Sequence, residues 1–262
     1  MAALGSYLHI RSWGGEWHVR IDDLDPPREQ PGAADSILRA LEACALQWDG
    51  PVVYQSTRGE SYQEALDQLL HSGKAYPCAC TRREIASAAR QGASGPIYPG
   101  FCRDGLPAGR RERTLRVYTD GSVISFTDVA AGRIDCELQV EVGDFVVRRA
   151  DGLPAYHLAC VVDDATDGFT HIIRGCDLLS CTPAQIHLQY LLNLSIPEYY
   201  HLPLVCNDKG QKLSKQTQAA PLAIDNPAPA MIAALQVLGY APPADLGRGD
   251  AGEIIAWAGD NS

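Results

Sequence analysis

Lys209-Gly210-Gln211-Lys212-Leu213-Ser214-Lys215 places a glycine turn before two lysines and a serine. The ammonium group of lysine is a compact point charge that suits polyphosphate. A turn that presents two such groups beside backbone N–H donors can hold a triphosphate and stabilise the charge that builds when it is cleaved. Most exposed lysine pairs are only part of a solvated loop, so this pattern needs support from elsewhere in the chain.

The composition is that of a globular protein with one large domain, or a core domain with an insertion. The 262 residues are 46% hydrophobic and 21% charged. No apolar run approaches the roughly 18 residues that a membrane span needs. The 9 cysteines are odd in number, which argues against a complete disulfide framework. We therefore expect reduced thiols in a cytoplasmic protein.

A net charge of -10 argues against a general nucleic-acid binder, which usually carries a basic surface. A local basic strip remains compatible with that charge. The alternative is that the arginines in question are solvated or paired with acids. The candidate arginines are Arg110, Arg111, Arg113 and Arg116, with Arg82 and Arg83 as a second group.

Cys78, Cys80 and Cys102 have the spacing of metal ligands. A Cys-x-Cys pair and a third cysteine in the next turn-rich segment can bring three thiolates onto one tetrahedral ion. Three sulfurs leave a fourth position for water, a histidine or a phenolate. The alternative interpretation is that three buried apolar cysteines lie near each other by chance.

Two charged residues lie where strands are expected to end. Asp22 follows a strand predicted over 16–21, and Arg174 ends a strand predicted over 171–174. The carboxyl ends of strands in a nucleotide-binding sheet are where ligands bind, and arginine suits bidentate capture of a carboxylate. Each residue also has a plain interpretation: Asp22 as part of a polar turn, and Arg174 as an ordinary salt-bridge partner.

Three stretches of the chain, in this order, resemble the class I aminoacyl-tRNA synthetases. Residues 143–164 (GDFVVRRADGLPAYHLACVVDD) and 172–179 (IIRGCDLL) resemble the glutamyl-tRNA synthetase group. Residues 209–215 resemble the second signature loop of the class, which is KMSKS-like. From Ala2 to about Leu222 the chain is most similar to short relatives of that group, the glutamyl-queuosine tRNA(Asp) synthetases.

The resemblance implies an α/β fold, a doubly wound (Rossmann-like) class I catalytic domain with an inserted small zinc-binding lobe. It implies four segments: 1–74 and 143–215 as the two parts of the nucleotide-binding domain, 75–142 as the lobe, and 216–262 as a short C-terminal helical segment. The family opens on a strand and a His-x-Gly-His-like turn, whereas this sequence opens on a predicted helix at 2–12. We therefore expect the first strand and first signature to be missing, with low stability and little activation activity as the consequence.

The resemblance also implies the chemistry and the residues that serve it. Glutamate would be activated with ATP and Mg²⁺, and the glutamyl group would pass to queuosine in the anticodon of tRNA(Asp). The implied residues are Lys215 for catalysis, Lys212, Ser214 and Lys215 for ATP, Asp22, Tyr156 and Arg174 for glutamate, and Cys78, Cys80, Tyr98 and Cys102 for zinc. Asp22 stands where the family has a glutamate, so its carboxylate is one methylene shorter.

Two other interpretations remain open at this point. The chain could be a fragment of an ordinary glutamyl-tRNA synthetase, or a catalytically inactive relative that still binds tRNA. Residues 216–262 are too few for the large helical anticodon-binding region of the ordinary enzyme, which favours the queuosine-modifying relative. We expect a monomer that binds ATP, L-glutamate and tRNA(Asp) and has no membrane contact.

Overall fold

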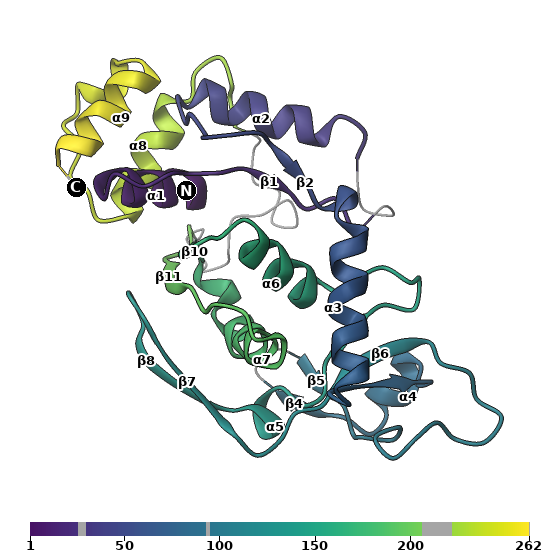
Figure 1. Ribbon diagram of the computed structural model, residues 1–262. Coiled ribbons are helices and arrows are strands. Elements are labelled where there is room, and N and C mark those ends of the chain that lie inside the picture. Colours follow the sequence, from purple (N-terminus) through teal and green to yellow (C-terminus); the bar gives the residue numbers. More distant parts are fainter. Residues whose placement is uncertain (26–29, 93–94, 206–221, 262) are drawn as a thin grey trace. The chain divides into compact units, whose positions relative to one another are not determined.

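The computed structural model describes residues 1–25, 30–92, 95–205 and 222–261 (Figure 1). The chain divides into two compact units. The first unit is built from residues 1–54, 173–177 and 201–262, and the second from residues 55–172 and 178–200. The segments predicted from the family pattern, with boundaries near 74, 142 and 215, do not follow this division and stay a prediction.

The first unit is mainly helical. Its helices are α1 (Ala2–Ser12), α2 (Ala33–Ala43), α8 (Ala228–Val237), the short η4 (Leu246–Arg248) and α9 (Ala251–Asp260). Two short strands, β1 (Arg20–Ile21) and β2 (Val53–Tyr54), pair in parallel. The core of this unit gathers apolar side chains from α1, α8 and α9, among them Leu4, Leu8, Met231, Leu235 and Ile254. The helix predicted over 2–12 is confirmed.

The second unit has a helical layer made of η1 (Gln55–Thr57), α3 (Gly59–His71), α6 (Tyr156–Thr166) and α7 (Thr182–Leu192). α3, α6 and α7 contact one another, as Figure 1 shows. α7 is buried on nearly every face, including its polar residues Gln185, His187 and Gln189. The 3-10 helix η2 (Cys176–Cys181) leads into it.

A second part of this unit is built around the strand β6 (Thr114–Val117). β3 (Ala75–Cys78) and β9 (Val146–Arg148) pair with β6 on either side, both antiparallel. Next to them lie α4 (Arg82–Ala86) and a hairpin of β4 (Arg90–Gly92) and β5 (Gly95–Ile97). β9 pairs within this sheet although it lies after the predicted boundary of the lobe at 142.

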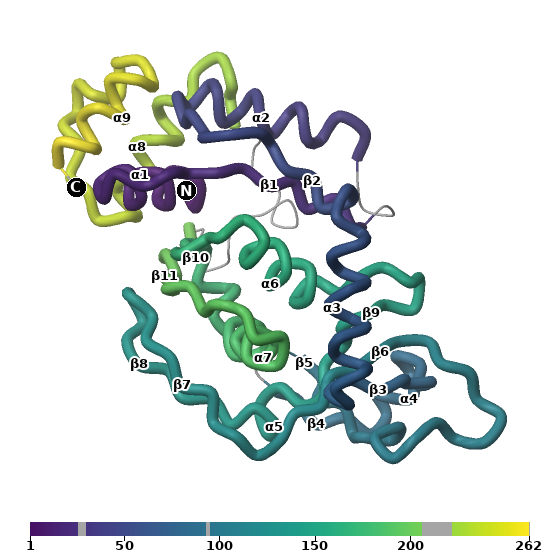
Figure 2. The backbone as a smooth tube through the Cα atoms, viewed as in Figure 1, coloured from purple at the N-terminus to yellow at the C-terminus, as the bar shows by residue number. Residues whose placement is uncertain are grey.

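β7 (Val123–Asp128) and β8 (Gly132–Glu137) form an antiparallel ribbon that is easily followed in Figure 2. β11 (Glu198–Leu202) pairs with β7 in parallel, and β10 (His171–Gly175) lies beyond β11. β6 and β7, which follow each other in the chain, belong to different sheets. The short helix α5 (Leu138–Glu141) follows β8 directly.

The described strands form four separate sheets, ordered β1-β2, β10-β11-β7-β8, β3-β6-β9 and β4-β5. The α/β class is confirmed. A single doubly wound sheet is not formed by the described residues, because β6 and β11 each have both edges occupied within their own sheets. No helix in the described part of the chain combines the length and apolarity needed to span a bilayer.

Candidate functional site

The three cysteines predicted to bind a metal converge in the second unit. The sulfur atoms of Cys78, Cys80 and Cys102 all lie within 4.8 Å of one another. The Tyr98 Oη lies 3.4 Å from the Cys78 and Cys80 sulfurs, and the Cys80 and Cys102 sulfurs are 3.7 Å apart. Zinc–sulfur bonds of about 2.3 Å in a tetrahedron place two sulfurs about 3.8 Å apart. The predicted convergence is confirmed, and the spacing fits a zinc-sized ion.

Local sequence explains why these groups meet. Cys78 ends β3, and Thr81 starts α4 with a capping box in which Thr81 Oγ1 accepts from the Glu84 N–H and the Glu84 carboxylate accepts from the Thr81 N–H. The Cys102 N–H donates to Tyr98 Oη at 2.9 Å. Gly100, between them, has a φ of 87° that favours glycine. The turn therefore brings the phenol and the third thiol to the same point.

The thiols of the cluster differ in acidity. Burial raises the pKa of Cys78, but hydrogen bonds from Tyr98, the Cys80 backbone and Arg116 outweigh it and lower this pKa to about 7. Burial and the neighbouring thiols raise the pKa of Cys80 to about 11. Without a cation, the cluster favours one thiolate beside neutral neighbours.

Arg116 does not belong to the predicted basic strip. Arg110, Arg111 and Arg113 are exposed, whereas Arg116 is only 7% exposed. The Arg116 Cζ lies 3.9 Å from the centroid of the Tyr98 ring, and its Nη1 donates to the Asp144 carbonyl at 2.7 Å. The prediction that Arg116 lies on a surface strip is therefore wrong.

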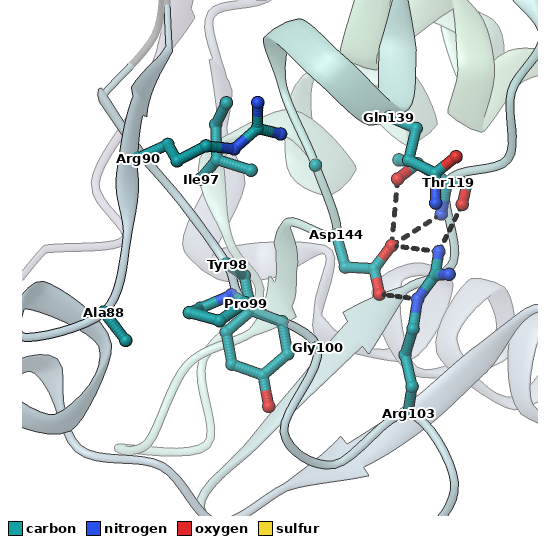
Figure 3. Close-up of a pocket in the computed structure, with 11 residues that line it drawn as sticks. Ala88, Arg90, Ile97, Tyr98, Pro99, Gly100, Arg103, Thr119, Gln139 and Asp144 are labelled. Carbon is teal, nitrogen blue, oxygen red and sulfur yellow. Dashed lines mark hydrogen bonds and ion pairs between the residues drawn. The ribbon is translucent and has the colours of Figure 1, made fainter.

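A cavity of about 340 Å³ opens beside Tyr98 and is drawn in Figure 3. One wall is the carboxylate of Asp144, which is 4% exposed. It binds Arg103 Nε at 2.5 Å and Nη2 at 2.8 Å, the Tyr76 hydroxyl at 2.5 Å and the Thr119 N–H at 2.8 Å. Burial raises the pKa of Asp144, but Arg103, Tyr76 and Thr119 together hold it below its usual value. Asp144 thus ties the turn after Cys102 to β3 and β9.

Two of the predicted glutamate-binding residues lie in the first unit. Asp22 follows β1, and its carboxylate binds Arg20 Nε at 3.0 Å with 48% of the side chain exposed. Arg174 lies in β10 and donates from Nε to His201 Nε2 at 3.1 Å. Gly175 leaves room for Asp177, whose Oδ1 would lie 2.5 Å from a Cβ at that position. Both predicted residues therefore lie at or just beyond strand ends, as expected.

Tyr156 is the first residue of α6 in the second unit and is 43% exposed. Farther along the same helix, Asp163 is fully buried and accepts from Gln55 Nε2 at 2.8 Å, Arg58 Nη1 at 3.2 Å and Tyr62 Oη at 2.9 Å. Sequence reasoning did not assign these contacts, since the donors lie about a hundred residues earlier. The predicted ATP-binding residues Lys212, Ser214 and Lys215 lie outside the described residues.

Residues 1–247 match the family described as tRNA synthetases class I (E and Q), catalytic domain. The chain is 52% identical, over 263 residues, to a glutamyl-Q tRNA(Asp) synthetase of Dechloromonas aromatica, covering 100% of this chain and 87% of that relative. The chain belongs to the glutamyl-Q tRNA(Asp) synthetase family. A glutamyl-Q tRNA(Asp) synthetase of Chromobacterium violaceum is 51% identical over 98% of this chain and 85% of its own length. The family resemblance drawn from the three sequence stretches is confirmed.

A solved structure supports the fold independently of close sequence similarity. The crystal structure of a glutamate tRNA ligase from Elizabethkingia meningosepticum, in complex with its amino acid, matches with a TM-score of 0.76 over 97% of this chain. Identity to that protein is 23%, and the chain spans 60% of its length. The likeness establishes the class I synthetase catalytic fold for this chain.

Proposed function

We propose that this chain is a ligase that activates glutamate with ATP and transfers the glutamyl group to queuosine in the anticodon of tRNA(Asp). The observation that carries this proposal is the 52% identity over the whole chain to a protein named glutamyl-Q tRNA(Asp) synthetase. The fold shared with a glutamate tRNA ligase is consistent with the same first step.

The reaction has two steps. In the first, a carboxylate oxygen of glutamate attacks the α-phosphorus of ATP in line, and pyrophosphate leaves. In the second, a hydroxyl of the queuosine cyclopentenediol attacks the glutamyl carbonyl, loses its proton and displaces AMP. Positioning and charge stabilisation carry most of the rate in such reactions, so no side-chain nucleophile is required. ATP acts with Mg²⁺, which neutralises phosphate charge.

We assign the roles from the family pattern and the described contacts. Lys215 and Lys212 would offset charge on the phosphates, with Ser214 as a further ATP contact. Arg174 would bind a substrate carboxylate, and its contact with His201 fixes the direction of the guanidinium. Asp22 would face the ammonium group of glutamate and Tyr156 would complete the amino-acid site.

We propose that zinc is bound by Cys78, Cys80, Tyr98 and Cys102 and holds the lobe of residues 75–142 together. The described distances support this, since they match the edges of a tetrahedral set. By the family pattern, 1–74 and 143–215 would form the nucleotide-binding domain and 216–262 a helical extension. We expect a monomer that works in the cytoplasm, where its tRNA is found.

Pyrophosphate exchange tests the activation step. A form of the protein that includes the first strand and first signature of the family should exchange labelled pyrophosphate into ATP in the presence of L-glutamate and not of L-glutamine. Lys215→Ala should lower the exchange rate about a hundredfold while leaving the KM for glutamate little changed, because it removes a charge donor to the transition state. Arg174→Gln should instead raise the KM for glutamate. Arg133→Gln, at an exposed position in β8, is the matched control.

The proposal would be contradicted by exchange that does not depend on glutamate. Exchange unaffected by Lys215→Ala would remove Lys215 from catalysis. A well-folded chain with no exchange, with or without tRNA(Asp), would favour the inactive tRNA-binding relative.

A further inference from the structure

Arg116 is a buried cation whose counter-charge is not a carboxylate. It is 7% exposed, and no carboxylate in the described ranges forms an ion pair with it. Asp144 offers it only a backbone carbonyl, because the Asp144 carboxylate is taken by Arg103. The Arg116 Nε is buried and has no hydrogen-bond partner among the described residues. Burying a cation in this way is costly unless negative charge lies close by.

The negative charge that faces Arg116 comes from the thiol cluster. The guanidinium stacks on Tyr98, 3.9 Å from the ring centroid, and the Tyr98 hydroxyl lies 3.4 Å from the Cys78 and Cys80 sulfurs. Three metal-bound thiolates carry more negative charge than one divalent ion neutralises. A cation stacked on the face of an aromatic ring is attracted to it, which holds Arg116 and the Tyr98 ring together. The positive charge of the buried Arg116 and the net negative charge of the metal with its ligands therefore complement each other.

We propose that Arg116 compensates the charge of the metal–thiolate cluster and fixes the Tyr98 ring, so that it sets how tightly the metal is held. This inference rests on the zinc site proposed above. Arg116 is a positioning residue, since its role is exerted through Tyr98 and Cys78. It accounts for the burial of an arginine in the middle strand of the lobe, which packing alone does not favour.

A second arginine near the cluster provides a matched control. Arg110 is exposed, and its Nη1 binds the Glu84 carboxylate at 2.8 Å while its Nη2 donates to the Ala79 carbonyl at 2.7 Å. Its charge already has a partner and is screened by water. Removing Arg110 should therefore leave the metal almost unaffected, although it lies in the same lobe.

The test measures zinc content and the release of zinc to a chromogenic chelator from the folded full chain. Arg116→Met, which keeps an unbranched apolar stem but not the charge, should weaken zinc binding about ten- to hundredfold. Arg116→Lys keeps the charge and loses the planar stacking, so its zinc affinity should fall by about tenfold or less. Arg110→Gln should change the affinity about fivefold or less. Circular dichroism confirms that each variant is folded.

A folded Arg116→Met variant that holds zinc as tightly as the parent would overturn the role of Arg116 while leaving the zinc site in place. A parent chain that binds no zinc would overturn the site itself. Should Arg116→Met fail to fold, Arg116→Gln decides the question, since it keeps a polar donor in the side chain and removes the charge. These readouts do not use glutamate activation, so a zinc-loaded chain without ligase activity would contradict only the proposed function.

Discussion

Asp144 and Asp163 are both buried carboxylates, and each is bound by one arginine and one tyrosine. Their partners differ in origin. Three donors to Asp163, namely Gln55, Arg58 and Tyr62, come from one segment, residues 55–62, so this aspartate ties the start of α3 to α6. The donors to Asp144 come from three segments, namely β3, the turn after Cys102 and the loop after β6.

The difference shows how one chemical arrangement serves two structural purposes. Asp163 joins two regular elements that already pack against each other. Asp144 instead gathers one strand and two irregular segments, one of which carries a proposed zinc ligand next to Arg103. Loss of Asp163 should therefore act on global stability alone, and loss of Asp144 should also act on the thiol cluster.

The largest expected effect is that of Asp163→Ala. This change leaves Arg58, Tyr62 and Gln55 without their shared acceptor inside the protein, so the free energy of unfolding should fall by about 3 kcal/mol or more. Urea denaturation measures it. Asp167→Ala is the control: Asp167 also binds Arg58 but is 19% exposed, so its loss should cost less. Zinc affinity should not change; a variant that weakens zinc binding would break the comparison.

Asp144→Asn should lower the free energy of unfolding by about 2 kcal/mol at neutral pH, since it weakens hydrogen bonds made to a charged group. The pKa of Asp144 is held below its usual value in the folded state. Its contribution is therefore present above the unfolded pKa of about 3.9 and is lost as the pH falls through the lower folded pKa. Urea denaturation from pH 7 to acid should show the free energies of unfolding of the parent and the variant converging. The variant should also release zinc faster than the parent. A pH-independent difference would contradict the charged role.

The two tyrosines test single bonds in each arrangement. Tyr62→Phe and Tyr76→Phe each remove one hydroxyl donor to a buried carboxylate. Each should lower the free energy of unfolding by about 1 kcal/mol, as for one buried hydrogen bond. Thermal unfolding measures both variants, and only Tyr76→Phe should speed zinc release. Equal zinc release from the two would remove the distinction.

The smallest effect is expected at an exposed pair of the same type. Arg133 and Asp135 form an ion pair on β8 that faces water. Asp135→Asn should leave the melting temperature unchanged within error, because exposed ion pairs contribute little. A clear drop would mean that burial is not what separates Asp144 and Asp163 from other aspartates of the chain.

Local patterns made part of this molecule predictable. The metal ligands lie in two short stretches, Cys-x-Cys at 78–80 and Tyr-x-x-x-Cys at 98–102, and the turn between Tyr98 and Cys102 needs only a few residues to close. The helix over 2–12 likewise follows from spacing within one element. The family stretches were specific enough to fix the α/β class and the synthetase family.

Long-range contacts made the rest unpredictable. Arg116 was placed on a basic strip because it follows other arginines in the sequence. β6 is paired on both edges, and Leu115, Arg116 and Val117 are all buried. The side chains of this strand therefore do not alternate between a buried and an exposed face. Asp144 and Asp163, near the two ends of the 143–164 stretch, find partners 25 to 108 residues away, which no local pattern reports.

The ligase assignment is tested most directly by the fate of labelled glutamate. The chain, ATP with Mg²⁺ and labelled L-glutamate are incubated with tRNA(Asp) that contains queuosine, and in parallel with tRNA(Asp) that lacks it. Label should appear only on the queuosine-containing tRNA, and nuclease digestion should place it in the anticodon fragment. Label at the 3′ end of a tRNA, or equal labelling with and without queuosine, would contradict the assignment.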